Sequence, residues 1–258
     1  MKTFNYKNAK IAFTDSGSGD TIILLHGYLE NRLMWQFCIP EMVKNKRIIA
    51  IDLLGHGDSD CLGYIHTIED QAEMVFGVLT HLQINNVSIV GHSMGGYIAL
   101  AFAELYPQHL QGLVLMNSTS LEDSLERKKN RDRAIAMVKK DYNAFVRLSI
   151  ANLFSPENRL LLVDQIENVK TAALKTPLQG IVAALEGMKI RKNRQSVFRH
   201  LKIPKLLILS KKDPVLDYLE NLKQIKNSDI QLATLADGHM SHIENRTELL
   251  QIIINFVS

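Results

Sequence analysis

Short, almost continuous runs of apolar residues recur along the chain, and each run is followed by a small or polar residue. The runs are TIILLHG (21–27), RIIAID (47–52), VSIVGHS (87–93), GLVLMNS (112–118), KLLILS (205–210) and IQLATLADG (230–238). Runs of this length without alternation are typical of strands buried on both faces, as in a parallel sheet. The pattern therefore predicts six parallel strands.

Helical patterns lie between several of these runs. The segment 67–83 begins with Thr67 and Asp70 at the spacing of a capping box, and ENRTELLQIIINFV closes the chain. The N-terminal segments TFNY and KIAFTD predict a short antiparallel edge pair, which brings the sheet to eight strands. Alternating strands and helices indicate an α/β fold with a doubly wound, mostly parallel sheet.

One interval of the chain breaks this alternation. The residues between the fourth and fifth parallel strands contain no convincing strand and predict helices over 124–140, 141–153, 155–174 and 176–189. The last two begin with Ser-Pro and Thr-Pro, and proline suits the first helical position. We therefore expect a core made of 1–120 and 201–258, with a helical cap at 121–200 over one end of the sheet.

Composition narrows the class of protein. The chain has 258 residues, of which 46% are hydrophobic and 22% charged, as in one large globular domain. No apolar run is long enough for a membrane span, and the N-terminus does not resemble a signal peptide. Cys38 and Cys61 lack metal or redox spacing and are expected to be free thiols. These features favour a cytoplasmic protein.

Charge is distributed unevenly along the chain. The net charge of +3 is too small to indicate a nucleic-acid partner. Residues 122–200, however, contain 16 Lys and Arg against 9 Asp and Glu. The simpler interpretation is a solvated helix face. The alternative is a lid that favours anionic substrates through inward-facing arginines, for which Arg131, Arg147 and Arg159 are candidates.

The segment GHSMG places Ser93 at a sharp turn between a predicted strand and a predicted helix. This G-x-S-x-G pattern is typical of a nucleophile elbow, in which glycines allow backbone segments to approach closely. Ser93 is expected to have a strained backbone and to lie near the helix N-terminus, where N–H groups stabilise developing negative charge. We expect Ser93 to be a nucleophile.

A serine hydroxyl needs a base to remove its proton, and the base needs a group that orients it. His239 and Asp213 each follow one of the last two predicted strands, so loops at the same edge of the sheet carry both. His242 is an alternative base. Asp217 and Asp237 lie near the proposed acid and base, but Asp213 follows its strand directly.

Four motifs resemble the α/β-hydrolase superfamily: LLHGY (24–28), DLLGHGDS (52–59), GHSMGG (91–96) and the pair SKKDP with DGHMSHIEN. The chain order Ser93, Asp213, His239 also agrees with that family. The resemblance implies an oxyanion hole formed by the backbone N–H groups of Tyr28 and Met94. It implies a small-molecule substrate, no metal and no organic cofactor.

Other residues near these motifs have simpler interpretations. His26 and His92 flank the two functional turns and are expected to be hydrogen-bonded turn residues, and His56 to stabilise a loop with Asp52 and Ser59. Trp35 follows the oxyanion turn and is expected to belong either to the pocket wall or to the core.

Within the superfamily, serine rather than aspartate at the elbow disfavours dehalogenases and epoxide hydrolases. The basic insertion disfavours aminopeptidases, which need acidic groups for the substrate amine. A serine hydrolase resembling carboxylesterases remains, acting on an ester, lactone, thioester or cleavable C–C bond. Two alternatives stay open: a lyase resembling the menaquinone-pathway synthase, and a ligand receptor with little catalysis.

Overall fold

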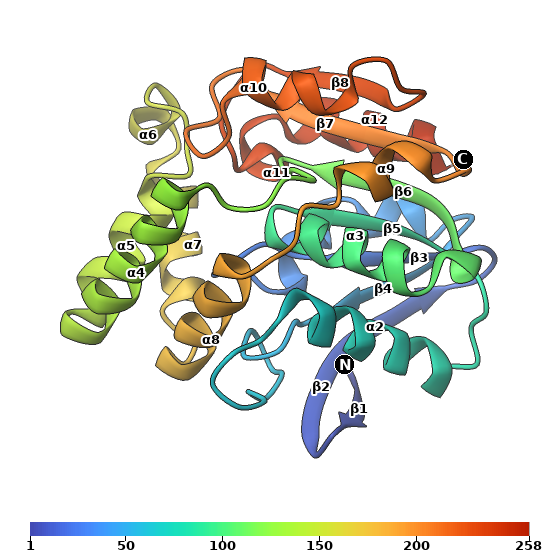
Figure 1. Ribbon diagram of the computed structural model, residues 1–258, viewed down its shortest axis with the longest axis horizontal. Coiled ribbons are helices and arrows are strands. Elements are labelled where there is room, and N and C mark those ends of the chain that lie inside the picture. The colour runs from blue at the N-terminus through green and yellow to red at the C-terminus, as the bar shows by residue number, and fades with distance from the viewer. Residues whose placement is uncertain (258) are drawn as a thin grey trace.

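The computed structural model describes residues 1–257 and contains one eight-stranded sheet (Figure 1). The strands lie in the order β1-β2-β4-β3-β5-β6-β7-β8. Their bounds are β1 Lys2–Tyr6, β2 Ala9–Gly17, β3 Thr21–Leu25, β4 Arg47–Ile51, β5 Val87–His92, β6 Leu110–Met116, β7 Lys205–Ser210 and β8 Gln231–Leu235. β1 and β2 pair antiparallel, β2 is antiparallel to β4, and the other pairs are parallel. The predicted strands and fold class are confirmed.

Two helical layers cover the sheet, because alternate residues of each central strand face opposite sides. The first layer contains α2 (Ile68–His81), α3 (Met94–Leu105) and α9 (Gln195–His200); Ile23 and Leu25 of β3 belong to the core on this side. The second contains the 3-10 helix η1 (Arg32–Phe37), α1 (Ile39–Met42) and α12 (Arg246–Val257), and Ile22 and Leu24 belong to the core on that side. The near-continuous apolarity of the strands thus reflects burial on both faces.

The strand order places two functional turns side by side. From β3 the chain first adds β4 on one side and then β5 on the other, so β3 lies between them. Leu25 at the end of β3 is in register with Gly91 near the end of β5. A reversal of strand order of this kind leaves a crevice at the carboxyl ends of the strands, where ligands commonly bind in α/β proteins.

The residues between β6 and β7 form helices that lie together at the left of Figure 1, apart from α9, which contacts α3. Their bounds are α4 Leu125–Lys140, α5 Tyr142–Ala151, α6 Asn158–Leu161, α7 Val163–Ala173 and α8 Leu178–Lys189. The single helix expected over 155–174 is two helices, interrupted at Leu162. Pro177 lies at the N-cap of α8 with extended backbone, rather than at the first helical position. Within residues 1–257, no helix is both long and apolar enough to cross a membrane.

Candidate active site

Ser93 occupies a strained turn between β5 and α3. Its φ of 50° and ψ of −112° lie outside the regions that ordinary residues adopt. Its N–H donates to the carbonyl of Met116, at 2.9 Å, and its carbonyl accepts hydrogen bonds from the Gly96 N–H and the Ser118 hydroxyl. The surrounding backbone therefore determines this conformation, as the sequence pattern predicts.

Glycine is required around Ser93 because three backbone segments meet there. A Cβ on Gly91 would overlap the carbonyl of Gly95 on the opposite side of the turn. A Cβ on Gly95 would overlap the carbonyl oxygen of Leu25 and lie 2.8 Å from that of His26. Gly95 thus allows the nucleophile turn to pack directly against the turn that follows β3.

The loops after β7 and β8 bring Asp213 and His239 together. His239 Nδ1 lies 2.7 Å from Asp213 Oδ2, and both side chains are almost completely buried. The N–H of His239 donates to the carbonyl of Leu153, so a residue of the insertion fixes the loop after β8. His239 lines the same cavity as Ser93. Within residues 1–257, the Ser93 hydroxyl and the His239 ring make no direct hydrogen bond, and such bonds are often long in unliganded sites.

Asn117, which the sequence analysis did not single out, supports Asp213. It follows β6 in a left-handed conformation, with φ of 44°, and its Nδ2 donates to Asp213 Oδ2 at 3.0 Å. The other carboxylate oxygen accepts the N–H groups of Val215 and Leu216. Burial opposes the charge, but His239, Asn117 and the Val215 N–H outweigh it and lower the pKa of Asp213. The sequence signal that could have identified Asn117 is its position as a polar residue directly after a predicted strand.

His26, in the turn after β3, and His56, in the loop after β4, have structural roles. His26 Nδ1 donates to the carbonyl of Gly27, and its Nε2 accepts the N–H of Leu53, so His26 is a neutral tautomer. Burial lowers the pKa of His26 to about 4 and that of His56 to about 3. Neither ring lines the cavity that contains Ser93.

The loop around Asp52 is held as expected from its sequence. The backbone carbonyl of Asp52 accepts a hydrogen bond from the Ser59 hydroxyl. The carboxylate of Asp52 forms an ion pair with the guanidinium of Arg32. The carboxylate also accepts the N–H of Asp58. These contacts close the turn after β4.

His242 lies in the short helix α11 (Ser241–Glu244), and its ring faces Glu30 and His92. Its Nε2 is 3.6 Å from Glu30 Oε1, and burial lowers its pKa to about 4. His242 does not line the cavity that contains Ser93, whereas His239 does. The geometry thus favours His239 over His242 as a base for Ser93.

The backbone N–H groups of Tyr28 and Met94 are available as donors. Among the described residues, neither N–H donates a hydrogen bond to another protein group. Met94 is the first residue of α3, where helix N–H groups have no intrahelical acceptor. Tyr28 lies in a turn in which the Gly27 N–H donates to Glu30 and Leu29 has a φ of 62°.

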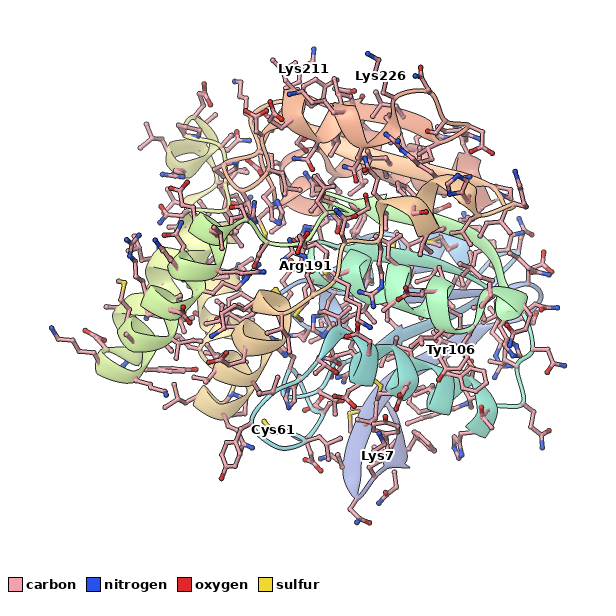
Figure 2. The ribbon with its side chains drawn as sticks, in the orientation of Figure 1. Lys7, Cys61, Tyr106, Arg191, Lys211 and Lys226 are labelled. Atoms are coloured by element: carbon pink, nitrogen blue, oxygen red, sulfur yellow. The ribbon has the colours of Figure 1, made fainter. Side chains whose placement is uncertain are left out.

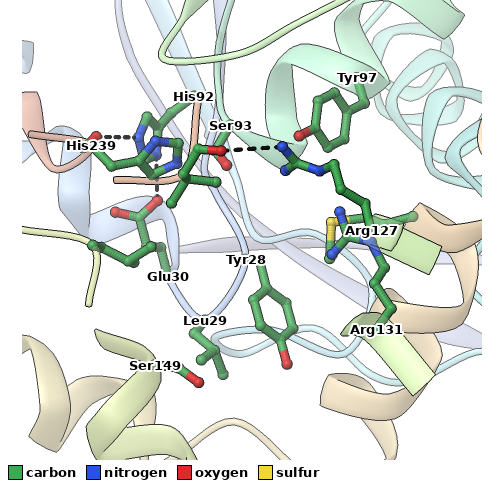
Figure 3. A pocket seen from close by; sticks show the side chains of 13 residues that line it. Tyr28, Leu29, Glu30, His92, Ser93, Tyr97, Arg127, Arg131, Ser149 and His239 are labelled. Atoms are coloured by element: carbon green, nitrogen blue, oxygen red, sulfur yellow. Dashed lines mark hydrogen bonds and ion pairs between the residues drawn. The ribbon is translucent and has the colours of Figure 1, made fainter. Parts of the chain in front are cut away.

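Figure 3 shows the cavity between these turns and helix α4, which has a volume of about 100 Å³. Of the residues named from sequence, Tyr28, Ser93, His239 and the candidate Arg131 line it. The sequence analysis missed part of the lining, namely Glu30, Tyr97, Arg127, Ser149, Leu153 and Val215. Helical periodicity does not reveal which face of α4 or α5 turns toward a nucleophile on another segment.

Trp35 does not line this cavity. Its side chain is fully buried in the second core layer, among residues such as Leu24 and Ile48. Trp35 belongs to η1, whose buried face packs on the sheet. Of the two interpretations of Trp35, the pocket wall is wrong and the core residue is correct.

A second cavity lies on the other side of the turn after β3 and has a volume of about 270 Å³. It shares Leu29 and Glu30 with the first cavity and is lined mostly by apolar residues of η1, α7 and α11. The Oε1 atom of Glu30 and the Nδ1 atom of His242 are buried here without a hydrogen-bond partner in the described structure.

Comparisons with known proteins agree with this architecture. Residues 20–246 match the family model described as alpha/beta hydrolase fold. A putative 2-succinyl-6-hydroxy-2,4-cyclohexadiene-1-carboxylate synthase from Bacillus subtilis is 28% identical over 96% of this chain and 95% of its own length.

Two solved structures extend the comparison. The malate-bound structure of a thermophilic esterase from Thermogutta terrifontis is 28% identical, has a TM-score of 0.88 and covers 96% of this chain and 93% of its own. The enol-lactonase from Burkholderia xenovorans is 18% identical, has a TM-score of 0.91 and shares the fold over 99% of both chains. The chain belongs to the alpha/beta hydrolase family and is an enzyme of this type.

Proposed function

We propose that this protein is a serine hydrolase that cleaves a small-molecule carboxylic ester or lactone through an acyl-enzyme on Ser93. The single observation that carries the proposal is the cavity itself. It contains the strained Ser93 and His239, whose Nδ1 is 2.7 Å from the buried carboxylate of Asp213. A nucleophile, a base and an orienting acid are the groups that acyl transfer requires.

In the first step, the Ser93 hydroxyl attacks the carbonyl carbon of the substrate while His239 Nε2 accepts its proton. Asp213 keeps the proton of His239 on Nδ1, which leaves Nε2 free as the base, and stabilises the imidazolium that forms. The carbonyl oxygen becomes an oxyanion and accepts hydrogen bonds from the free backbone N–H groups of Tyr28 and Met94.

In the second step, the tetrahedral intermediate collapses and the bond to the leaving oxygen breaks. His239 donates its proton to that oxygen, so a neutral alcohol leaves and an ester to Ser93 remains. Water then attacks this ester with His239 again as base, and the carboxylic acid is released. In a lactone the leaving alcohol stays attached to the acid.

The relatives support this reaction class. The Thermogutta terrifontis protein is named an esterase and its structure holds malate, a small organic acid. The Burkholderia xenovorans protein is named an enol-lactonase, although its low identity supports only the fold. Both names describe cleavage of an acyl–oxygen bond, and the small cavity around Ser93 suits a substrate of low mass.

A second candidate function rests on the Bacillus subtilis relative, which spans almost the whole chain. In a reaction of that class, His239 and Ser93 would remove a proton from the substrate and no acyl-enzyme would form. A screen of acyl esters, lactones and enol substrates, with Ser93→Ala as the control, tests both candidates. A burst of p-nitrophenol from p-nitrophenyl acetate, equal to the enzyme concentration, supports the hydrolase. Turnover of an enol substrate without ester cleavage would support the synthase-like reaction, and no reaction of Ser93 with a fluorophosphonate would support a receptor.

A further inference from the structure

Three arginines surround one buried aspartate at the edge of the candidate active site. Asp123 Oδ1 lies 3.2 Å from Arg127 Nε and 2.6 Å from Arg191 Nη1, and Asp123 Oδ2 lies 2.5 Å from Arg131 Nε. The carboxylate is fully buried, which raises its pKa, but Arg131 and Arg191 outweigh the cost of burial and lower it. One fixed anion therefore holds three cations in place.

Arg191 and Arg194 are exceptions to the simpler interpretation of the basic insertion as a solvated helix face. Both side chains are only 2% exposed, whereas Lys192 between them is 67% exposed. Arg191 lies against the ring of Tyr97, with 4.2 Å between guanidinium carbon and ring centroid, at the junction of α8 and the core (Figure 2). Arg194 pairs with Glu69 and Glu104.

The arginine cluster leaves positive charge uncompensated beside the cavity. Three guanidinium groups and the carboxylate of Asp123 leave an excess of two positive charges. The other charged pair in the lining, Glu30 with His92, is a neutral ion pair as a whole. Among the described residues, no second carboxylate pairs with Arg127 or Arg131.

Arg127 and Arg131 line the cavity together with Ser93, as Figure 3 shows. Arg127 Nη1 donates to the carbonyl of Val215, which holds its side chain over the site. Tyr28 also lines this cavity, but its hydroxyl points away from Arg127 and Arg131 in Figure 3. The two arginines are therefore the cationic groups of the lining that can reach a ligand beside Ser93.

We propose that Arg127 and Arg131 form a subsite for a carboxylate of the substrate, so that the enzyme cleaves esters or lactones that carry a second, ionised acid group. The inference rests on the proposed function for the bond cleaved, but the carboxylate subsite stands on the cluster itself. A planar guanidinium binds a carboxylate through parallel N–H groups, and these charge-assisted bonds are about twice as strong as neutral ones. The Asp123 carboxylate orients both arginines and so acts as a positioning residue.

Matched substrates test the proposal on both sides of the scissile bond. For the acyl side, p-nitrophenyl hydrogen adipate is compared with p-nitrophenyl adipamate, in which a neutral amide replaces the carboxylate. For the alcohol side, O-acetyl lactate is compared with O-acetyl lactamide. We expect kcat/KM for the carboxylate member to exceed that of the amide at least about tenfold in one of the two pairs.

Variants connect this preference to the cluster. Arg127→Gln and Arg131→Gln should each reduce the preference at least about threefold, because each removes a donor to the substrate. Arg191 still pairs with Asp123 in both variants, and a thermal unfolding curve checks that each one folds. Arg147→Gln is the matched control, because Arg147 pairs with Glu167 on the outer surface and does not line the cavity. The preference should stay unchanged in this control.

A binding measurement separates failure of the subsite from failure of the hydrolase. Calorimetric titration of the Ser93→Ala variant with adipate should show saturable binding. The affinity should fall at least about threefold when Arg127→Gln is added to Ser93→Ala, and it should not change when Arg147→Gln is added instead. If adipate binds but no ester is turned over, the proposed subsite is supported and the proposed hydrolase activity is contradicted. Equal turnover of the acid and the amide in both pairs, with no adipate binding, would overturn the subsite and retain the hydrolase.

Discussion

Glu30 and His92 form a buried ion pair behind the nucleophile, with 2.6 Å between Glu30 Oε2 and His92 Nδ1. The other ring nitrogen of His92 lies 3.0 Å from the backbone carbonyl of His239. Both ring nitrogens therefore face acceptors, which requires an N–H on each and makes His92 an imidazolium. Glu30 also accepts the N–H of Gly27, so the pair connects the turn after β3 with the loop that carries His239.

The pKa shifts of the pair agree with this assignment. Burial raises the pKa of Glu30, but the charge of His92 outweighs it, and the pKa falls to about 2. Burial likewise lowers the pKa of His92, but Glu30 outweighs it, with a smaller contribution from Asp213, and the pKa rises. The remaining neighbours, His26 and His242, are neutral near pH 7 because both have a pKa of about 4.

We expect this pair to make stability depend on pH at both ends. The contribution of Glu30 is present above the usual carboxylate pKa and is lost as pH falls toward about 2. The contribution of His92 is fully present below the usual imidazole pKa and is lost as pH rises through its raised pKa. Urea unfolding of the wild type and of Glu30→Gln at a series of pH values measures this difference.

At about pH 6, Glu30→Gln should lower the free energy of unfolding by about 3 kcal/mol, because it leaves a buried imidazolium unpaired. The difference from wild type should shrink as the solution becomes alkaline. His200→Asn, at an exposed position on α9, should show no such trend. A difference that stays constant across the pH series would show that His92 is not charged in the folded protein.

Ser93→Ala and His239→Ala should each abolish most ester turnover. Residues of a nucleophile–base pair act as one unit, so each change should lower kcat by about 10⁴ to 10⁶ and the double variant should lose little more. His242→Ala should have a mild effect, because that ring does not line the cavity with Ser93. Steady-state kinetics with p-nitrophenyl acetate measures all four proteins. Full activity in His239→Ala together with inactivity in His242→Ala would reverse the assignment of the base.

Asn117→Ala should slow catalysis without removing any group that contacts substrate. Asn117 donates to Asp213 and to the Ser210 hydroxyl and accepts the Ser241 hydroxyl at 2.6 Å. Loss of these bonds frees the carboxylate that orients His239, and we expect a decrease in kcat of about tenfold with a loss of about 1–3 kcal/mol of stability. KM should change little. An unchanged kcat in a folded Asn117→Ala protein would assign Asn117 a purely structural role.

Gly95→Ala should destabilise the fold and disturb the oxyanion turn together. The added Cβ would overlap the carbonyl of Leu25, so either β3 or the start of α3 must move, at a cost of about 1–3 kcal/mol. Gly77→Ala is the control for glycine replacement within a helix, because Gly77 lies in α2 without a positive φ and its added Cβ would meet only the side chains of Phe4 and Tyr6. Thermal unfolding compares the two. Equal changes in Tm would mean that the packing of Gly95 against Leu25 adds nothing.

The sheet could be predicted from sequence because its central strands are buried on both faces. Residues 205–210 show this directly, since every residue of β7 is buried and the apolar run has the length of the strand. Helices of the insertion were less predictable: Leu162 interrupts a helix without proline or glycine at that position. Local sequence gives no signal for a break that tertiary packing imposes.

The site was predictable only where chemistry requires a fixed residue type at a fixed place. Ser93, Asp213 and His239 follow strands that end at one edge of the sheet, and the structure brings all three to that edge. Arg127 and Glu30 reach the cavity through tertiary contacts that span the chain, such as the bond from Arg127 to Val215. No local pattern distinguishes such residues from a surface arginine or glutamate.

The central claim is that Ser93 carries an acyl group during turnover. Mass spectrometry of the protein, acid-quenched during reaction with p-nitrophenyl acetate and then digested, measures this directly. The account predicts an added acetyl group on the peptide that contains Ser93, absent from Ser93→Ala. Ester turnover that persists in Ser93→Ala, with no acetyl group on that peptide in the wild type, would contradict it.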